Sequence, residues 1–214
     1  IYIFIYIHIL IKKTYNQNKS NYIIGMDYVK TLIELKKYKT AVSSLNKLHI
    51  LPYEHAGEGR DLYTSAYFGS TMEEINKKDY NKAINLINTS KEWPEQLGVG
   101  KPYNVDERIQ DYLLFYCYSK LDNNKAEKYL KKIIDYSRSN IKNKSFSHWL
   151  GLKAIKNLEG IEASKKFSMQ LSNSSHGSTE ETKWIINNFF NTKGPINQEL
   201  NQNFKMINEI LMLN

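Results

Sequence analysis

Apolar residues recur every three or four positions over most of the chain, and short polar stretches separate these apolar stripes. The first clear stripe predicts an amphipathic helix, and a polar turn and a second, shorter stripe follow it before Pro52. The pattern therefore predicts a pair of helices rather than a single long one. The residues of the first stripe are Tyr28, Val29, Leu32, Ile33 and Leu35.

The same pair of stripes recurs three more times, so the chain contains an internal repeat. In each second stripe an alanine is followed four positions later by a large apolar residue. A small residue is needed where the second helix crosses closest to the first, because a bulky side chain would push the helices apart. We therefore predict an all-α, helix-pair solenoid with four helix pairs in residues 22–171. The small and large residues are Ala41 and Leu45, Ala83 and Ile87, Ala126 and Leu130, and Ala163 and Phe167.

This repeat resembles the tetratricopeptide repeat, and the turn from Lys78 to Ala83, Lys-Asp-Tyr-Asn-Lys-Ala, carries the resemblance best. The alanines lie 42, 43 and 37 residues apart, whereas that repeat has a period of about 34 residues. The glycine expected before the turn is replaced by Lys36, Lys78 and Asp122. The period alone also fits HEAT-like repeats of about 40–47 residues, so both kinds of helix pair stay open.

Two inserts follow the ends of second helices, and we expect both on one edge of the array. The first covers residues 52–61, and the second runs from residue 93 to residue 108. Two prolines, two glycines and two large aromatic residues lie within residues 93–103, which predicts an ordered loop with its own packing. Loops on rigid scaffolds often carry function. The candidate binding residues are Tyr53, Glu54, His55, Arg60, Trp93, Pro94, Leu97, Gly98, Gly100, Lys101, Pro102, Tyr103 and Arg108.

Both ends of the chain differ from the repeats. Residues 1–21 comprise the apolar run Ile1–Ile11 and a polar linker, and the missing initiator Met suggests the edge of a truncation. Three interpretations of the run are open: a truncated membrane or signal segment, the tail of an upstream domain, or a helix packed on the first repeat. Eleven apolar residues are too few for a stable membrane span. Residues 172–214 predict two helices, Glu180–Phe190 and Asn197–Leu213, and the last would cap the array.

Composition adds few constraints. The 214 residues suit one domain or a short repeat array, with a hydrophobic content of 41%. Cys117 is the single cysteine, which fits a reducing, cytoplasmic compartment; a periplasmic location stays open if a signal sequence lies upstream. The net charge of +8 comes with lysines scattered in pairs along helix surfaces, as in Lys36-Lys37 and Lys131-Lys132. Solvated helix faces explain these lysines better than a nucleic-acid groove, so we expect no nucleic-acid partner.

The sequence predicts no catalytic residue, no cofactor and no metal site. The segment Gly98–Lys101 lacks the earlier glycine and the following Ser or Thr of a phosphate-binding loop. None of the five histidines pairs with another ligand at metal-binding spacing. Cys117 lies in an apolar stripe and is interpreted as a buried small residue. Asp106, Glu107 and Asp111 fit the start of a helix, where negative charge is favourable, and Asp111 lies near Arg108.

A second resemblance comes from the inserts. Two runs resemble the C-terminal tetratricopeptide region of large bacterial, Bacteroidetes-type proteins: Lys91–Tyr103, continued by Asp106–Arg108, and the earlier Leu51–Tyr63. Those proteins carry an N-terminal domain of unknown function that is similar to galactose mutarotase. The resemblance implies that the chain is the helical arm of a larger protein, and it transfers no catalytic residue.

Two hypotheses for the function follow. The first is a non-enzymatic scaffold that binds a protein partner or a neighbouring domain of the same protein. The second is an accessory part of a carbohydrate-active or glycan-binding protein, in which the Trp93–Tyr103 loop contacts the sugar or the neighbouring domain.

Overall fold

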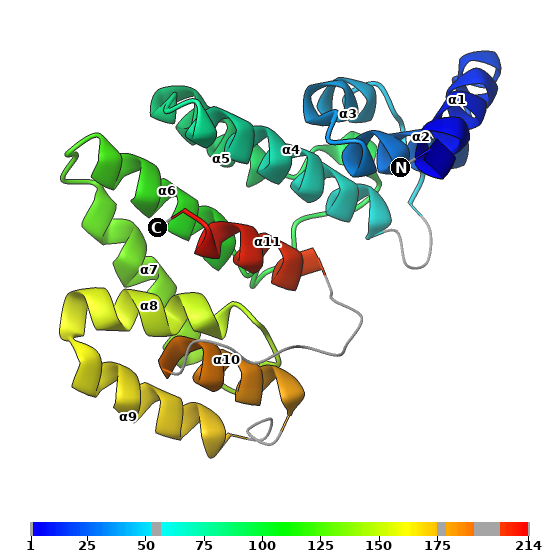
Figure 1. The fold of residues 1–214 in the computed structure, drawn as a ribbon. Helices are drawn as coiled ribbons and strands as arrows, with labels where there is room; N and C mark the ends of the chain where they lie inside the picture. Colours follow the sequence, from blue (N-terminus) through cyan, green and yellow to red (C-terminus); the bar gives the residue numbers. More distant parts are fainter. Residues whose placement is uncertain (1, 53–56, 175–178, 191–201, 214) are drawn as a thin grey trace. The chain divides into compact units, whose positions relative to one another are not determined.

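The chain is all-α, as its periodicity predicts. A computed structural model describes residues 2–52, 57–174, 179–190 and 202–213, with the side chains described from residue 5 onward. These residues form eleven α-helices and one short 3₁₀ turn, and no strand lies among them (Figure 1). The chain divides into two compact units, Ile1–Val105 and Asp106–Asn214, and each is described by itself. In these ranges no helix combines the length and apolar character that crossing a bilayer requires.

The first unit is built from consecutive helix pairs. Helix α2 contacts α3 and also α4, and α4 contacts both α3 and α5. Each first helix therefore packs on its own partner and on the next first helix, which is the arrangement of tetratricopeptide-like pairs. The elements are α1 (Tyr2–Gln17), α2 (Tyr22–Glu34), α3 (Tyr38–Leu45), α4 (Glu58–Asn76), α5 (Tyr80–Ser90) and the 3₁₀ turn η1 (Glu95–Leu97).

The apolar N-terminal run is part of a helix that packs on the first pair. Helix α1 contacts α2 and continues past Ile11 as far as Gln17. Its His8 ring stacks on Tyr28 with a centroid separation of 5.6 Å, and His8 Nδ1 lies 2.9 Å from Thr31 Oγ1. Of the three interpretations of this run, the structure shows the helix packed on the first repeat.

The second unit continues the same packing rule. Helix α6 contacts α7 and α8, and α8 contacts α7 and α9. Helix α10 contacts α8 and α9, which is the place that the first helix of a further pair would take. The predicted helix Glu180–Phe190 has these bounds, and the predicted last helix is described from Gln202 onward. The elements are α6 (Arg108–Lys120), α7 (Ala126–Ser139), α8 (His148–Glu159), α9 (Ile161–Ser172), α10 (Glu180–Phe190) and α11 (Gln202–Leu211).

The predicted small and large residues hold in the first two pairs. Ala41 and Ala83 have no exposed surface, and Leu45 and Ile87 are buried beside them. The large residues of the other pairs, Leu130 and Phe167, are buried as well. The predicted burial of the large residue is therefore confirmed in all four pairs.

The prediction for the small residue is wrong in the last two pairs, since Ala126 and Ala163 are only partly buried. In α7 the helix starts later after the turn, and Tyr129 takes the inner position, where its ring stacks on Tyr118 with centroids 5.5 Å apart. In α9 the inner residue is Ser164, which is fully buried. The crossings of these pairs thus use a stacked tyrosine and a serine in place of alanine.

The turns inside the first three pairs share one backbone geometry. Lys36, Lys78 and Asp122 have φ values of 55°, 63° and 47°, in the left-handed region. The N–H of Lys78 donates to Ile75 O (2.8 Å) and that of Asp79 to Glu74 O (3.0 Å), which is the hydrogen-bond pattern of a Schellman motif. The other two turns repeat this pattern. These are the three positions at which the repeat would carry glycine, so the chain keeps the conformation without the residue that favours it.

A buried carboxylate joins three helices of the first unit. Glu74 on α4 lies 3.1 Å from Lys77 Nζ, 3.3 Å from Lys39 Nζ on α3 and 3.4 Å from Lys82 Nζ on α5. The hydrogen bond from Lys77 and the charges of these lysines lower the pKa of Glu74 to about 2. The ionised carboxylate therefore links the turn of the second pair to the pair before it.

The crossing of α4 and α5 yields a stability prediction. Ala83→Leu should lower the free energy of unfolding by about 1–3 kcal/mol, because the larger side chain overpacks a position with no exposed surface. Ala126→Leu is the matched control, since Ala126 is only partly buried, and it should change stability by well under 1 kcal/mol. Urea unfolding of both variants measures the difference, and equal effects would contradict the crossing described for α5.

The left-handed turns yield a second stability prediction. Lys78→Gly should raise the free energy of unfolding by about 0.5–1 kcal/mol, because an L-residue pays for a left-handed backbone and glycine does not. Asn76→Gly serves as control, since Asn76 ends α4 at an ordinary helical φ and should lose stability. Thermal unfolding followed by circular dichroism would refute the account if Lys78→Gly also loses stability.

Candidate interaction surfaces

The base of the second insert is fixed by packing. Leu97 is 1% exposed and belongs to the core of the first unit. The backbone N–H of Ile50, just before the first insert, donates to Gln96 O at 2.8 Å. Gly98 has a φ of +74°, and a Cβ there would lie 2.7 Å from Ile50 O, so glycine is required by both conformation and space. The structure thus brings the bases of the two inserts together.

Arg60 holds the end of α5 and the start of the loop. Its Nη2 donates to Ser90 O (2.7 Å) and its Nη1 to Glu92 O (3.0 Å), so the guanidinium caps carbonyls at the helix C-terminus. The Arg60 Cζ lies 4.5 Å from the centroid of the Trp93 ring and 5.1 Å from that of Tyr63. Arg60 is therefore a buried packing residue, and it covers one face of Trp93.

The remaining candidate residues of this loop divide into two groups. Pro94 precedes η1 and is half-buried, whereas the tip of the loop is exposed and the Tyr103 side chain is fully so. In the first insert, Tyr53, Glu54 and His55 lie outside the described residues. The exposed tip consists of Gly100, Lys101, Pro102 and Tyr103.

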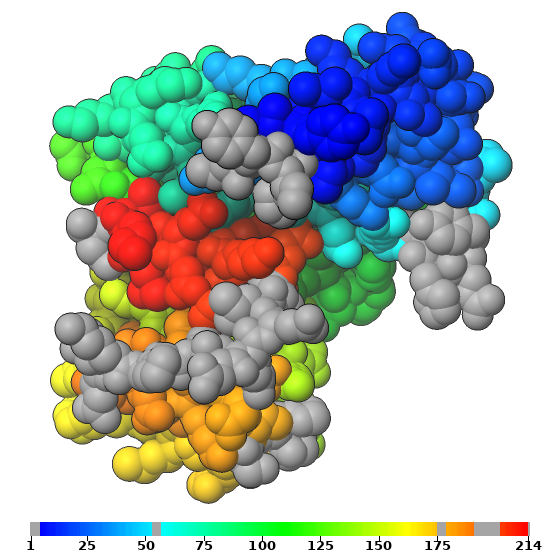
Figure 2. Space-filling model, turned by 45° about the vertical axis from the view of Figure 1, so that its right-hand side comes forward, coloured from blue at the N-terminus to red at the C-terminus, as the bar shows by residue number. Residues whose placement is uncertain are grey.

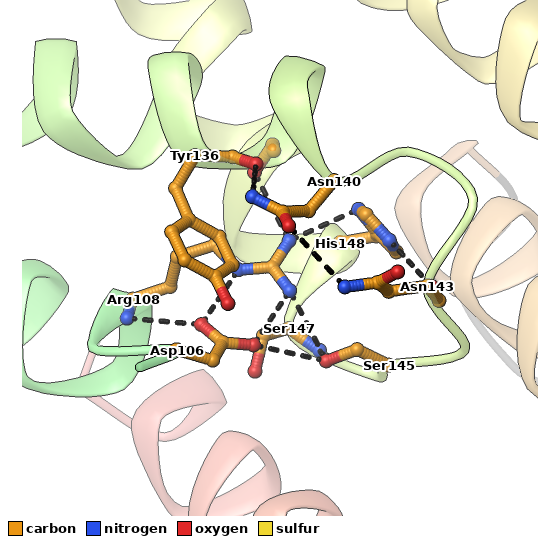
Figure 3. Close-up of polar contacts among 9 residues, drawn as sticks. Asp106, Arg108, Tyr136, Asn140, Asn143, Ser145, Ser147 and His148 are labelled. Carbon is orange, nitrogen blue, oxygen red and sulfur yellow. Dashed lines mark hydrogen bonds and ion pairs between the residues drawn. The ribbon is translucent and has the colours of Figure 1, made fainter. Parts of the chain in front are cut away.

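Arg108, the last candidate residue, lies in the second unit at the centre of a buried polar cluster (Figure 3). It is 1% exposed, although its charged head would ordinarily be solvated. The guanidinium makes a two-bond contact with Asp106, with Nε 2.8 Å from Oδ1 and Nη2 2.7 Å from Oδ2. Burial opposes the charge of Asp106, but the hydrogen bonds and charge of Arg108 lower its pKa overall. This ion pair joins Arg108, the first residue of α6, to Asp106 in the segment that precedes the helix.

The other side of the Arg108 guanidinium faces α7 and α8. Nη1 donates to Ser137 Oγ (3.1 Å) and to His148 Nδ1 (3.0 Å), and Nη2 donates to Ser145 Oγ (3.1 Å). Tyr136 lies over the guanidinium, with Cζ 5.1 Å from its ring centroid. One side chain therefore fixes the N-terminus of α6, the last turn of α7 and the segment that leads into α8.

The cluster assigns the tautomer of His148. Its Nδ1 accepts from Arg108, so Nε2 carries the hydrogen and donates to Asn143 O at 2.9 Å. Burial and the neighbouring Arg108 charge lower the pKa of His148 to about 4. The ring is 1% exposed, so it has no access to a reactant. These polar groups are best explained as a structural joint of the second unit.

Helix α11 is packed on the first helices of the second unit. It lies beside α6 in Figure 1 and contacts that helix. Its Phe204 ring lies 4.9 Å from the ring of Trp184 on α10 and 4.9 Å from that of Phe146, which precedes α8. Four of its side chains are buried, while its outward side forms part of the visible surface in Figure 2. The first helices thus form a face that already holds one amphipathic helix. The buried residues of α11 are Phe204, Met206, Ile207 and Ile210.

An open groove lies on the same face, between α6 and α8. It has a volume of about 500 Å³, and Leu213, just after α11, contributes to its wall. Its other notable walls are three partly buried aromatic rings and three lysines, and none of its lining residues is acidic. We name this the lysine–aromatic groove. Its aromatic and basic residues are Tyr112, Phe115, Tyr116, Lys120, Lys153 and Lys156.

Sequence periodicity does not reveal this groove, because Tyr112 and Tyr116 lie at the same helical spacing as the buried residues of α6. Both are only partly buried, whereas Leu113 and Cys117 of the same stripe lie in the core. Cys117 has no exposed surface, so its interpretation as a buried small residue is confirmed, and burial raises the pKa of its thiol to about 12. The missed signal was the number of aromatic residues in α6, which exceeds what one buried face holds.

In the described ranges no three His, Cys, Asp or Glu side chains converge as the ligands of a metal ion would.

No protein-family model matches the chain, and no curated protein matches it. Among solved structures the chain is similar to YrrB, described as a TPR protein with an unusual peptide-binding site. The match has 12% sequence identity and a TM-score of 0.38, and covers 95% of this chain and 91% of that chain. At this TM-score no residue correspondence is drawn, and the helix-pair assignment rests on the contacts above.

The pKa of His148 predicts a pH dependence of stability. The folded pKa is about 4, below the unfolded value of about 6.5, so the unfolded chain binds the extra proton between these values. The free energy of unfolding should therefore fall as the pH drops from about 6.5 to about 4, by up to about 3 kcal/mol from this residue. His148→Gln keeps a donor and an acceptor but does not titrate, and its urea-unfolding profile should be flatter in this window. Parallel profiles for the parent and the variant would contradict the buried, neutral ring.

Proposed function

We propose that the chain is a non-enzymatic scaffold that binds a protein partner on the α6–α8–α10 face of the second unit. The observation that supports this best is α11, an amphipathic helix that packs on the face through Phe204, Ile207 and Ile210. Helix-in-groove recognition uses apolar side chains at this spacing. The buried side chains of α11 therefore indicate the pattern that a partner helix would present.

The length of α11 strengthens this argument. It has ten residues, and isolated helices of fewer than about 12–15 residues are marginal in water. Its outward residues, including Asn203, Lys205 and Glu209, are polar. The helix is therefore stabilised by the apolar face beneath it, and the same face offers that stabilisation to another helix of matching pattern.

The further proposal that the chain is the helical arm of a larger bacterial protein rests on the resemblance of Lys91–Tyr103. The exposed tip of that loop remains a candidate contact for a neighbouring domain. The glycan-binding alternative has less support, because Arg60 covers one face of Trp93 and leaves Tyr103 as the exposed aromatic ring.

A peptide experiment tests the scaffold proposal. Ile207→Asp places a charge at a position of α11 with no exposed surface, which should release the helix from the face. A fluorescein-labelled peptide with the sequence of residues 202–213 should then bind this variant. It should bind the parent chain at least about tenfold more weakly, since the tethered α11 competes at high effective concentration.

Lys205→Asp is the matched control, because Lys205 lies on the outward side of α11 and its variant should behave as the parent does. Circular dichroism verifies that each variant keeps its helices, and Phe204→Ala provides a milder release. If both released variants stay folded and neither binds the peptide, this face is not a helix-binding surface.

A further inference from the structure

We propose that the lysine–aromatic groove binds an acidic peptide segment, with the carboxylates on Lys120, Lys153 and Lys156 and an apolar side chain on the aromatic wall. This inference rests on the proposed function and names the partner's chemistry. The groove adjoins the end of α11, since Leu213 lines it. A partner helix on the α11 site would therefore continue into the groove.

The aromatic wall supplies the apolar part of the site. Tyr112 and Phe115 have centroids 5.6 Å apart and are tilted by 59°, so the two rings form an angled pocket rather than a flat platform. Together with Tyr116 they are partly exposed, in contrast to the buried Leu113 and Leu114 on the same helix. Three half-exposed rings on one side of α6 leave apolar surface that a partner side chain would bury.

The lysines supply the charge. Each ammonium group lies over an aromatic ring: Lys120 over Tyr116 (5.1 Å), Lys153 over Trp149 (4.9 Å) and Lys156 over Phe189 (5.9 Å). These contacts hold the side chains at the wall of the groove. Among the described residues, none of the three lysines forms an ion pair with a carboxylate.

The other described lysines of the second unit vary in their contacts, and Lys128 and Lys132 also lie over an aromatic ring, that of Tyr129. Lys131, Lys144, Lys165 and Lys183 each pair with a glutamate at 2.6–2.9 Å. What distinguishes the groove is that three lysines line one cavity and that none of its lining residues is acidic.

The two lysines on α8 also oppose one another. Lys153 and Lys156 are three residues apart on one helix, and like charges at this spacing destabilise a helix. Burial and the Lys156 charge lower the pKa of Lys153, which reports the same strain. A carboxylate in the groove would compensate both charges.

Geometry favours a peptide over a nucleic acid. Single-stranded nucleic acid is bound along an extended basic groove with rings on which bases stack flat. Here the groove has a volume of about 500 Å³, and two of its rings are tilted by 59° to one another. A short segment with two or three carboxylates next to an apolar side chain matches these dimensions.

Fluorescence anisotropy with the full chain tests the proposal. The probe is a labelled short peptide in which glutamates flank a Phe-Leu pair, compared with a glutamine version and a labelled oligouridylate. We expect the acidic peptide to bind at least about tenfold more tightly than the glutamine version, with an affinity that falls as salt rises. Lys153→Glu/Lys156→Glu should weaken binding at least about tenfold, and Lys153→Ala/Lys156→Ala by less.

Lys125→Glu/Lys166→Glu is the matched control, since both lysines are exposed and neither lines the groove. It carries the same change in net charge and should bind within about twofold of the parent. Equal losses in the groove and control variants would overturn the assignment, as would tighter binding of the oligouridylate. The peptide of residues 202–213 distinguishes the two proposals: if it binds the Ile207→Asp variant while the acidic probe does not bind, only the acidic-partner assignment fails.

Discussion

The tight reversal within each helix pair is the constraint on which the rest of the structure depends. At Lys36, Lys78 and Asp122 the chain turns through a left-handed residue, and the second helix then runs back along the first. A looser turn would allow ordinary backbone angles, but the second helix would then start farther away. The buried Ala83 shows the consequence, because it lets α5 approach α4 closely. Side chains that hold the second helix in this position, such as Glu74 with its three lysines, stabilise the reversal.

In both units an arginine joins the two helices of a pair at the end opposite the turn. Arg60 in α4 and Arg108 in α6 both lie in the first turn of a first helix. Each reaches the end of the second helix, and each lies against an aromatic ring there, Trp93 or Tyr136. The chain uses lysine at most of its basic positions. A planar guanidinium with five donors satisfies several fixed acceptors at once, which an ammonium group does not. Arg60 and Arg108 therefore stand where several fixed acceptors at the end of a helix pair must be satisfied at once.

Much of this fold follows from periodicity, and the remainder depends on contacts that periodicity does not contain. The bounds of α10 and the inner positions of Leu45, Ile87, Leu130 and Phe167 were predictable because a helix repeats every 3.6 residues. The inner position of Tyr129 was not, since a longer turn shifts the start of α7 and only the stacked partner Tyr118 compensates for the added bulk. For Arg108, sequence reasoning placed a binding residue where the structure has a buried joint. From a sequence alone, a charged side chain is assigned to the surface unless its partners are known. The partners of Arg108 lie up to 40 residues away in the sequence.

The α6–α8–α10 face differs from the joints in one physical respect. At Arg108 every described contact satisfies a buried donor, so the cluster contributes to the stability of the unit itself. In the lysine–aromatic groove the opposite holds: rings stay half-exposed, and Lys153 and Lys156 repel one another, with no ion pair to a carboxylate in the part of the chain that the structure describes. Folding alone gives no reason to keep such an arrangement next to a surface that already holds α11. A ligand that brings negative charge and an apolar side chain gives that reason, because one contact would both cover the exposed rings and offset the repulsion between the lysines.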